Sequence, residues 1–213
     1  MSAFTPRPTR KSPVRHPGGE PVWELAYMYP AQGDWSEEAY LALPTNLMAE
    51  YTDGRIEVLP MPTTAHQLIV LNLYRLLNDY VAAHGLGWVL VAPLPVRLRR
   101  GIYREPDVVF LSTARPERRA GDYPDGADLV MEVVGGSRED RRRDHVVKRA
   151  EYAAAGIAEY WIVDPHDETL TVLHLDASEY AEHGRFGKGA QATSALLPGL
   201  TIDVASVFAA AQA

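Results

Sequence analysis

The chain has 213 residues, of which 46% are apolar and 23% charged, and its formal net charge at pH 7 is −7. This length predicts one domain, and the composition is that of a globular protein with enough apolar residues for a core. The absence of cysteine excludes disulfide frameworks, thiolate metal sites and cysteine nucleophiles. The negative net charge argues against a surface that is basic everywhere, although a protein that binds nucleic acid needs only a local basic patch.

The N-terminal segment differs in composition from the rest of the chain. Residues 1–19 contain four basic residues, four prolines and no acid. Such a segment cannot pack a core, so we expect a disordered basic tail, with a solvated tail or cloning remnant favoured over nucleic-acid contact. A single domain is expected at residues 20–213. No apolar run approaches the ~18 residues of a membrane helix and no apolar signal-peptide core is present, which predicts a cytoplasmic protein.

The first part of the expected domain carries signals for a short helix and a hairpin. Asp34, with Glu37 three residues later, resembles a capping box and predicts a short helix that ends before Pro44. Asp53-Gly54 separates strand-like runs on both sides, and such a pair predicts a hairpin with a tight turn.

The remaining elements predict a mixed α/β fold. From residue 64 to residue 84 the apolar residues recur with helical period, with Thr63 or Thr64 as a cap and Gly85 just beyond the end. Together with a second helix described below, this predicts a mixed sheet of mostly antiparallel strands, flanked by two main helices. The other expected elements are strands at 88–92, 94–99, 103–111 and 169–175, a loop at 112–127, a glycine-rich hairpin at about 180–192, and a strand and helix at 200–210.

The segment from Asp128 to Asp164 predicts a strand, a helix and a second strand. Its first strand is an apolar run that is interrupted by Glu132 and stopped by Gly135-Gly136. A glutamate in such a strand is costly to bury unless it is paired or holds a metal. On the helix, four polar side chains at intervals of four residues share one face, namely Asp140, Asp144, Lys148 and Tyr152.

Two carboxylates and one lysine suggest metal-dependent chemistry. Asp107 follows Pro106 in an apolar strand, and Glu132 lies in the next expected core strand. Two such carboxylates repel each other unless one keeps its proton or a divalent cation lies between them, and oxygen ligands favour Mg²⁺ or Mn²⁺. Lys148 could reach back from the helix to orient a water or balance phosphate charge. Asp107, Glu132 and Lys148 are therefore the minimal set for metal-dependent phosphodiester hydrolysis.

The motifs PDVVFL, DLVMEVV and RRRDHVVKRAEYAAAGIAEYWIVDP resemble the Uma2 family, once known as a domain of unknown function. The resemblance extends to AEYTDGRIE, TTAHQ and SALLPGLTIDVASVF, and covers roughly residues 34–210. It implies a restriction-endonuclease-like core of the PD-(D/E)xK superfamily and a metal-dependent endonuclease acting on DNA. Residue by residue, it places Asp107 as the aspartate of PD, Glu132 as the glutamate of the ExK strand and Glu50 as an upstream acid that helps hold the metal. A homodimer is implied by analogy.

One position departs from the superfamily pattern. Val134 stands where ExK places its lysine, and Lys148 on the following helix matches the position that the lysine takes in Uma2-like sequences. The Gly-Gly-Ser at 135–137 also differs from the usual serine and proline after the strand. We expect a looser loop here, with no assigned role for Ser137.

Each candidate residue has a structural alternative. Glu132 could belong to a structural ion pair, Asp107 could cap a turn, Glu50 could be an exposed polar residue, and Lys148 could pair with Asp144 on the helix surface. His66 is a candidate for phosphate or water contact, or a packed histidine.

An arginine cluster and two aromatic residues also have more than one possible role. Arg138 and Arg142, with their arginine neighbours, are candidates for a nucleic-acid path or for a solvated face. Tyr152 and Trp161 are expected in the core. The alternatives to DNA cleavage are an inactive nucleic-acid or protein-binding module on the same fold, and hydrolysis of RNA or another phosphate ester.

Overall fold

The computed structural model describes residues 29–43, 48–209 and 211. The expected tail at 1–19 lies outside these residues. A six-stranded sheet with the strand order β10-β9-β8-β7-β6-β3 forms the centre of the fold. Only β7 and β8 are parallel, and every other pair of neighbours in this sheet is antiparallel. The strands are β3 (Gly87–Val91), β6 (Val108–Ser112), β7 (Leu129–Val133), β8 (Glu159–Asp164), β9 (Thr169–Asp176) and β10 (Glu179–Gly187).

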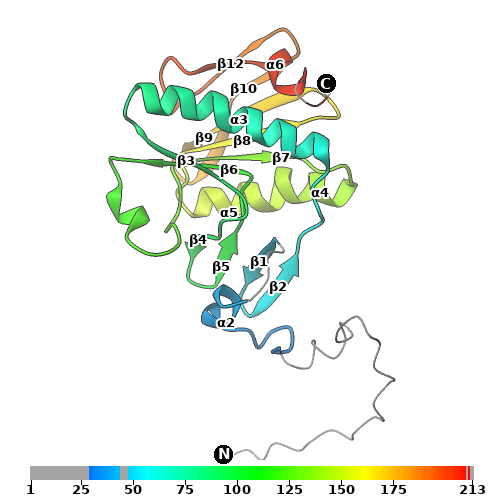
Figure 1. Cartoon of the computed structure of the whole chain (residues 1–213), viewed down its shortest axis with the longest axis vertical. Coiled ribbons are helices and arrows are strands. Elements are labelled where there is room, and N and C mark those ends of the chain that lie inside the picture. Colours follow the sequence, from blue (N-terminus) through cyan, green and yellow to red (C-terminus); the bar gives the residue numbers. More distant parts are fainter. Residues whose placement is uncertain (1–28, 44–47, 210, 212–213) are drawn as a thin grey trace, which may run out of the picture.

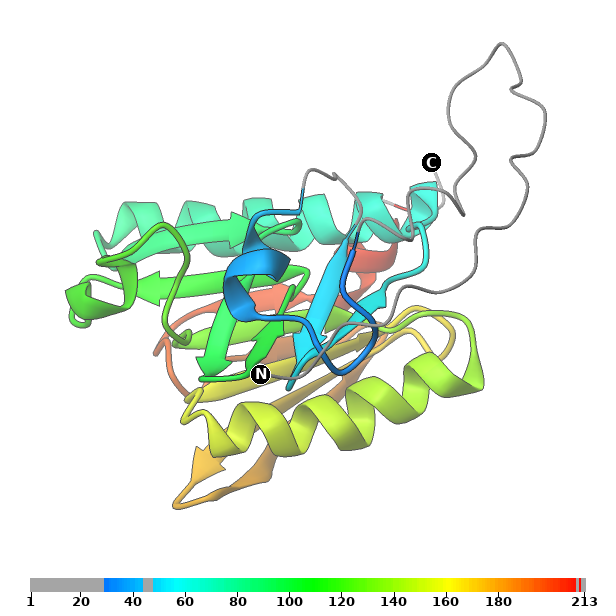
Figure 2. The ribbon, with the colours of Figure 1, turned by 90° about the horizontal axis from the view of Figure 1, so that it is seen from below.

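Helices cover both faces of the main sheet. Helix α3 (Thr64–Ala83) lies on one face, and the helical segment that joins β7 to β8 lies on the other (Figure 1, Figure 2). The apolar stripe of α3, including Leu73 and Leu77, packs on the sheet in one core cluster, and Tyr152 and Ile157 belong to a second cluster on the opposite face. The expected mixed sheet with two main helices is confirmed.

The segment between β7 and β8 contains a π-helical turn. It consists of α4 (Arg138–Arg142), the π-helical turn η2 (Arg143–Lys148) and α5 (Arg149–Ala154). Ser137 caps its start, because its hydroxyl accepts from the Asp140 N–H at 3.0 Å while the Asp140 carboxylate accepts from the Ser137 N–H at 3.1 Å. A side chain at Gly135 would collide with that carboxylate. Ser137, to which the sequence assigned no role, therefore forms a capping box with Asp140, whereas the expectation of a looser loop stays a prediction.

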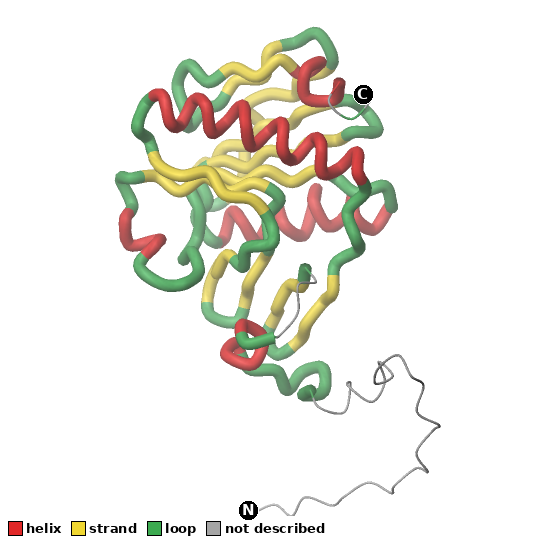
Figure 3. Tube along the Cα trace, viewed as in Figure 1, coloured by secondary structure: helices red, strands yellow, loops and turns green. Residues whose placement is uncertain are grey.

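A second, four-stranded sheet with the order β2-β1-β5-β4 lies at one end of the main sheet (Figure 3). Thr52 and Arg55 pair across the two-residue turn, where Asp53 and Gly54 have φ of 41° and 86°, so the predicted hairpin is confirmed. The strands of this sheet are β1 (Ala49–Thr52), β2 (Arg55–Val58), β4 (Val96–Arg99) and β5 (Ile102–Arg104).

Two predictions in this region are wrong in detail. The cap of α2 (Glu37–Leu41) is Ser36 and not Asp34, because the chain before it is held to the hairpin by the Trp35 N–H donating to Gly54. The expected strand at 103–111 is two strands that belong to different sheets, β5 and β6. Pro106 cannot donate a ladder hydrogen bond, and the chain changes sheets at this residue.

The C-terminal part also differs from the sequence expectation. The predicted hairpin at 180–192 does not form, because β10 pairs with β9, while β11 (Gln191–Thr193) pairs with β12 (Thr201–Asp203). Helix α6 (Val204–Ala209) follows, and the expected loop at 112–127 includes a 3₁₀ turn at Pro116–Arg119. Among the described residues, no helix combines the length and apolar character needed to cross a membrane.

Glu159 is a buried acid that the sequence analysis did not single out. Its carboxylate accepts four hydrogen bonds, from the Trp161 indole at 2.6 Å, the Ser194 hydroxyl at 2.7 Å, and the backbone N–H groups of Ala195 and Leu196 at 2.6 and 2.8 Å. These bonds tie β8 to the loop that precedes β12.

Replacing Glu159 with alanine should leave four donors without an acceptor. We expect the free energy of unfolding, measured by urea denaturation, to fall by about 3 kcal/mol or more. The control Glu179→Ala, at an exposed position on β10, should change it by less than about 0.5 kcal/mol. Equal effects of the two substitutions would contradict this structural role.

Candidate active site

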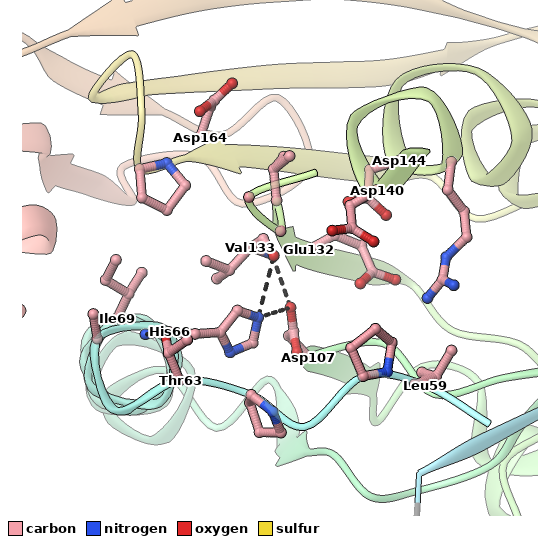
Figure 4. A pocket seen from close by; sticks show the side chains of 18 of the residues that line it. Leu59, Thr63, His66, Ile69, Asp107, Glu132, Val133, Asp140, Asp144 and Asp164 are labelled. Atoms are coloured by element: carbon pink, nitrogen blue, oxygen red, sulfur yellow. Dashed lines mark hydrogen bonds and ion pairs between the residues drawn. The ribbon is translucent and has the colours of Figure 1, made fainter. Parts of the chain in front are cut away.

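A cavity of about 490 Å³ lies where the main sheet meets the start of α3 and the helical segment after β7 (Figure 4). Four of the candidate site residues line it, namely His66, Asp107, Glu132 and Lys148. Glu50 is buried next to them on β1, and Arg138 and Arg142 are exposed on α4, away from the cavity lining. The fold therefore brings the acids and Lys148 together from β1, from β7, from the connection between β5 and β6, and from the helical segment after β7.

Lys148 is the centre of the charged cluster. Its Nζ lies 2.8 Å from Glu132 Oε1, 3.5 Å from Glu50 Oε1 and 3.6 Å from Asp144 Oδ1. The side chain is only 3% exposed, so its pair with Asp144 is buried and is not the surface salt bridge that their spacing allowed. Burial lowers the pKa of Lys148, but the three carboxylates outweigh that effect and raise its pKa above the ordinary value. Lys148 therefore remains protonated.

Glu132 has one occupied and one free carboxylate oxygen. Oε1 accepts from the Tyr152 hydroxyl at 2.5 Å and from the Lys148 ammonium. Oε2 has no hydrogen-bond or ion-pair partner among the described residues, and Glu132 lines the cavity. Burial raises the pKa of Glu132 above its ordinary value, with Asp107 and Asp144 adding to the rise and the Lys148 ammonium opposing it. The Lys148 ammonium is therefore the nearest group that stabilises the ionised carboxylate at this depth.

Asp107 shows the same arrangement at the point where the chain changes sheets. Its Oδ2 accepts from the Val133 N–H at 2.8 Å and lies 3.3 Å from His66 Nε2. Oδ1 has no hydrogen-bond or ion-pair partner within the described part of the chain. His66 Nε2 also lies 3.2 Å from the Val133 carbonyl, so the ring points into the cavity (Figure 4). Burial lowers the pKa of His66, but the hydrogen bond and charge of Asp107 raise it above its ordinary value.

Glu50 connects the small sheet to the cluster. Its Oε2 lies 3.6 Å from the Arg104 Nε, and Arg104 also donates two hydrogen bonds to Glu151 on α5, at 2.6 and 2.8 Å. Burial raises the pKa of Glu50, yet Lys148 and Arg104 together bring it below the ordinary value, which keeps the carboxylate ionised. Arg104 thereby fixes the position of β1 against the helix that carries Lys148.

The cavity is acidic overall. Its lining includes the six carboxyl groups of Glu105, Asp107, Glu132, Asp140, Asp144 and Asp164. The basic groups in the lining are fewer, namely the side chains of Arg143 and Lys148 and the imidazoles of His66 and His166. An unassisted polyanion would be repelled by such a surface, whereas a divalent cation would be attracted to it.

The sequence model of the Uma2 family, described as "Putative restriction endonuclease", matches residues 37–205. The chain belongs to the Uma2 family. No curated protein matches it. A solved structure, described as a putative nuclease belonging to DUF820 from Anabaena variabilis, superposes with a TM-score of 0.65 at 20% identity, covering 83% of this chain and 99% of that one. The sequence-based resemblance and the restriction-endonuclease-like fold are both confirmed.

The donor atoms of this Uma2 protein suit a magnesium site. Among the described residues no ready-made group of three or more His, Asp or Glu ligands is present. Magnesium nevertheless keeps several waters and commonly takes one or two carboxylates together with substrate phosphate oxygens. The two partnerless oxygens, Asp107 Oδ1 and Glu132 Oε2, belong to one cavity and offer such a ligand pair. Glu50 Oε1, which is buried without a hydrogen bond, is a third oxygen nearby.

Three functional neighbours in the Uma2 site were not singled out from the sequence as parts of the site. Tyr152 was expected in the core, which is confirmed, but its hydroxyl also contacts Glu132. Its spacing of four residues from Lys148 was the available signal. Glu105 is buried in the cavity wall, with Oε2 unpaired, and Arg104 contacts Glu50. Neither residue follows a pattern that distinguishes it from an ordinary strand residue.

Glu105 should make stability depend on pH. Burial, reinforced by the nearby Glu50 charge, raises its pKa from 4.5 to about 7. The unfolded chain then releases this proton before the folded chain does, so stability is lost as pH rises from about 4.5 to about 7. Glu105→Gln removes the titration. The unfolding free energy of the variant minus that of the wild type should therefore grow by up to about 3 kcal/mol over this window and stay level above it.

Urea unfolding of both proteins at pH 5, 6, 7 and 8 measures this difference. Glu182→Gln, at an exposed position on β10, is the control and should keep a constant difference from the wild type. A constant difference for Glu105→Gln as well would mean that the Glu105 carboxyl titrates as it does in the unfolded chain.

Proposed function

We propose that this Uma2 protein is a metal-dependent endonuclease that hydrolyses phosphodiester bonds in DNA, with Mg²⁺ or Mn²⁺ as cofactor. The observation that carries the proposal is the pair of unpartnered carboxylate oxygens, Asp107 Oδ1 and Glu132 Oε2, in a cavity that also contains a buried lysine ammonium. Membership of a family described as putative restriction endonucleases supports the same reaction class.

In this proposal the three acids hold the cation and Lys148 acts on the water or the phosphate. Asp107 and Glu132 would hold the cation, with Glu50 as the third carboxylate available to it. A bound divalent cation supplies charge neutralisation on the phosphate and makes a coordinated water more acidic. Lys148 remains protonated beside Glu132, where its ammonium can donate a hydrogen bond to the attacking water or to a phosphate oxygen. Glu50 and Asp144 keep that ammonium in place.

The acidity of the cavity favours this proposal over an inactive binding module. A module that bound a phosphate backbone without metal would gain from a basic surface. Here six carboxyl groups line the cavity against two permanently cationic side chains. A divalent cation removes this repulsion at the point where the scissile phosphate must approach. A homodimer would bring two copies of the site to the two strands of a duplex, and we include it in the proposal.

Substitution of the two candidate ligands tests the reaction. Glu132→Gln and Asp107→Asn should each weaken Mg²⁺ binding, measured by calorimetry, at least tenfold, because each removes one anionic ligand. Both should abolish nicking of supercoiled plasmid in the presence of Mg²⁺ or Mn²⁺. Glu182→Gln, which removes an exposed acid on β10, should leave both properties unchanged. Direct conversion of plasmid to the linear form would support paired sites in a dimer.

Two outcomes would contradict the proposal. If the wild type binds neither Mg²⁺ nor Mn²⁺, even with DNA present, Glu132 is a structural acid. An inactive binding module is then the better hypothesis for the function of the protein. If it binds the cation and cleaves RNA but not DNA, metal-dependent phosphodiester hydrolysis is supported and the proposed substrate class is wrong.

Arg138 and Arg142 are proposed as phosphate contacts. Both are exposed on α4, whereas their neighbours Arg141 and Arg143 are engaged with Asp164 and Glu57 at 3.0 and 3.1 Å. The double substitution to alanine should weaken DNA binding in EDTA, measured by fluorescence anisotropy, and reduce the slope of log affinity against log salt by about 1 to 2.

The control for this experiment is Arg75→Ala. Arg75 is exposed on α3, and its removal should leave the salt dependence as it is. Unchanged affinity of the Arg138 and Arg142 double variant would identify this arginine run as a solvated helix face.

A further inference from the structure

The two candidate metal ligands are held by the protein in the same way. In each, one carboxylate oxygen is occupied by two protein groups, and the other oxygen has no partner among the described residues. A carboxylate that is fastened at one oxygen cannot turn about its terminal bond without breaking those contacts. The free oxygen therefore keeps a defined direction before any cation arrives.

On the Asp107 side, the fastening groups are the Val133 N–H and the His66 ring. His66 Nε2 lies 3.3 Å from Asp107 Oδ2 and 3.2 Å from the Val133 carbonyl. Both neighbours are acceptors, so Nε2 must carry the hydrogen. The ring is placed by the first turn of α3, whose cap Thr63 accepts from the His66 N–H at 3.2 Å. One imidazole thus ties the start of α3 to the ends of β6 and β7.

On the Glu132 side, the two groups that contact Oε1 are the Lys148 ammonium and the Tyr152 hydroxyl. Tyr152 lies on α5, its hydroxyl donates to Oε1 at a distance of 2.5 Å, and its side chain is completely buried. Burial raises the pKa of Tyr152 well above its ordinary value, with the Glu132 charge adding to the rise, so the hydroxyl remains a donor. Tyr152 does not line the cavity in the described structure. Any effect on the reaction must therefore pass through Glu132.

We propose that His66 and Tyr152 are positioning residues, which hold Asp107 Oδ2 and Glu132 Oε1 so that Asp107 Oδ1 and Glu132 Oε2 are presented to one divalent cation. The inference rests on the proposed function, since it concerns the same cation. It also gives His66 a role different from the phosphate contact that the sequence suggested. The ring acts through Asp107 and need not touch nucleic acid.

Conservative substitutions separate positioning from packing. Tyr152→Phe removes only the hydroxyl, and Tyr180→Phe is its control, because the Tyr180 hydroxyl donates a buried hydrogen bond to the Ile157 carbonyl at 2.8 Å. His66→Ala removes the N–H donor, and His66→Gln restores an N–H donor at a similar reach. Calorimetry with Mg²⁺ measures affinity, and thermal unfolding in EDTA measures the effect on the metal-free fold.

We expect Tyr152→Phe and His66→Ala to weaken Mg²⁺ binding by about 10-fold or more, the loss seen when outer partners of metal ligands are removed. His66→Gln should recover most of the affinity, and Tyr180→Phe should bind as the wild type does. In EDTA, Tyr152→Phe and Tyr180→Phe should lose similar stability, because each loses one buried hydrogen bond. If Tyr152→Phe fails to fold, the two His66 variants decide the question.

The possible failures are distinct. A wild type that binds no divalent cation overturns the proposed function and this inference together. Wild-type Mg²⁺ affinity in both Tyr152→Phe and His66→Ala overturns the inference and leaves the proposed function standing. If His66→Ala weakens DNA binding in EDTA while its Mg²⁺ affinity is unchanged, His66 contacts nucleic acid and the positioning role is wrong.

Discussion

The buried ion pair between Lys148 and Glu132 is the constraint on which the rest of the site depends. A charge at such depth is stable only when an opposite charge and hydrogen bonds accompany it. Lys148 provides this compensation for three carboxylates at once, from β1, β7 and its own helix. The distance of 2.8 Å to Glu132 fixes how the helix sits against β7. Loss of the lysine would leave the acids uncompensated, so the site and the packing of this face are coupled.

The chain also changes sheets directly beside the site. Three consecutive residues, Glu105, Pro106 and Asp107, separate β5 from β6 and place two carboxyl groups at the junction. Arg104, the last residue of β5, contacts Glu50 on β1 and Glu151 on α5. The small sheet is therefore linked to the helix that carries Lys148 by charged contacts. Its position determines where Glu50 can lie relative to the ammonium.

Local features of this fold can be predicted from sequence patterns. The predictions that are wrong concern features that depend on contacts between distant segments. The Asp53-Gly54 turn and the period of α3 depend on neighbouring residues, and both predictions are confirmed. The strand at 103–111 looks continuous, because nothing in its own pattern reveals that its halves pair with different partners. Asp144 and Lys148 have the spacing of an exposed helix pair. Only the packing of that helix face against β7 buries them, and the hydroxyl of Tyr152 acquires its partner in the same way.

Two buried glutamates on neighbouring strands show how a structural acid can be distinguished from a candidate functional one. Glu159 on β8 has both oxygens filled by four donors, which leaves nothing for a ligand. Glu132 on β7 is also buried, yet its two donors both contact Oε1, and Oε2 has no partner among the described residues. Burial of a carboxylate is costly, and folding alone would favour a partner for each oxygen. Glu132 thus offers an oxygen at the cavity where a cation could bind, whereas Glu159 offers none.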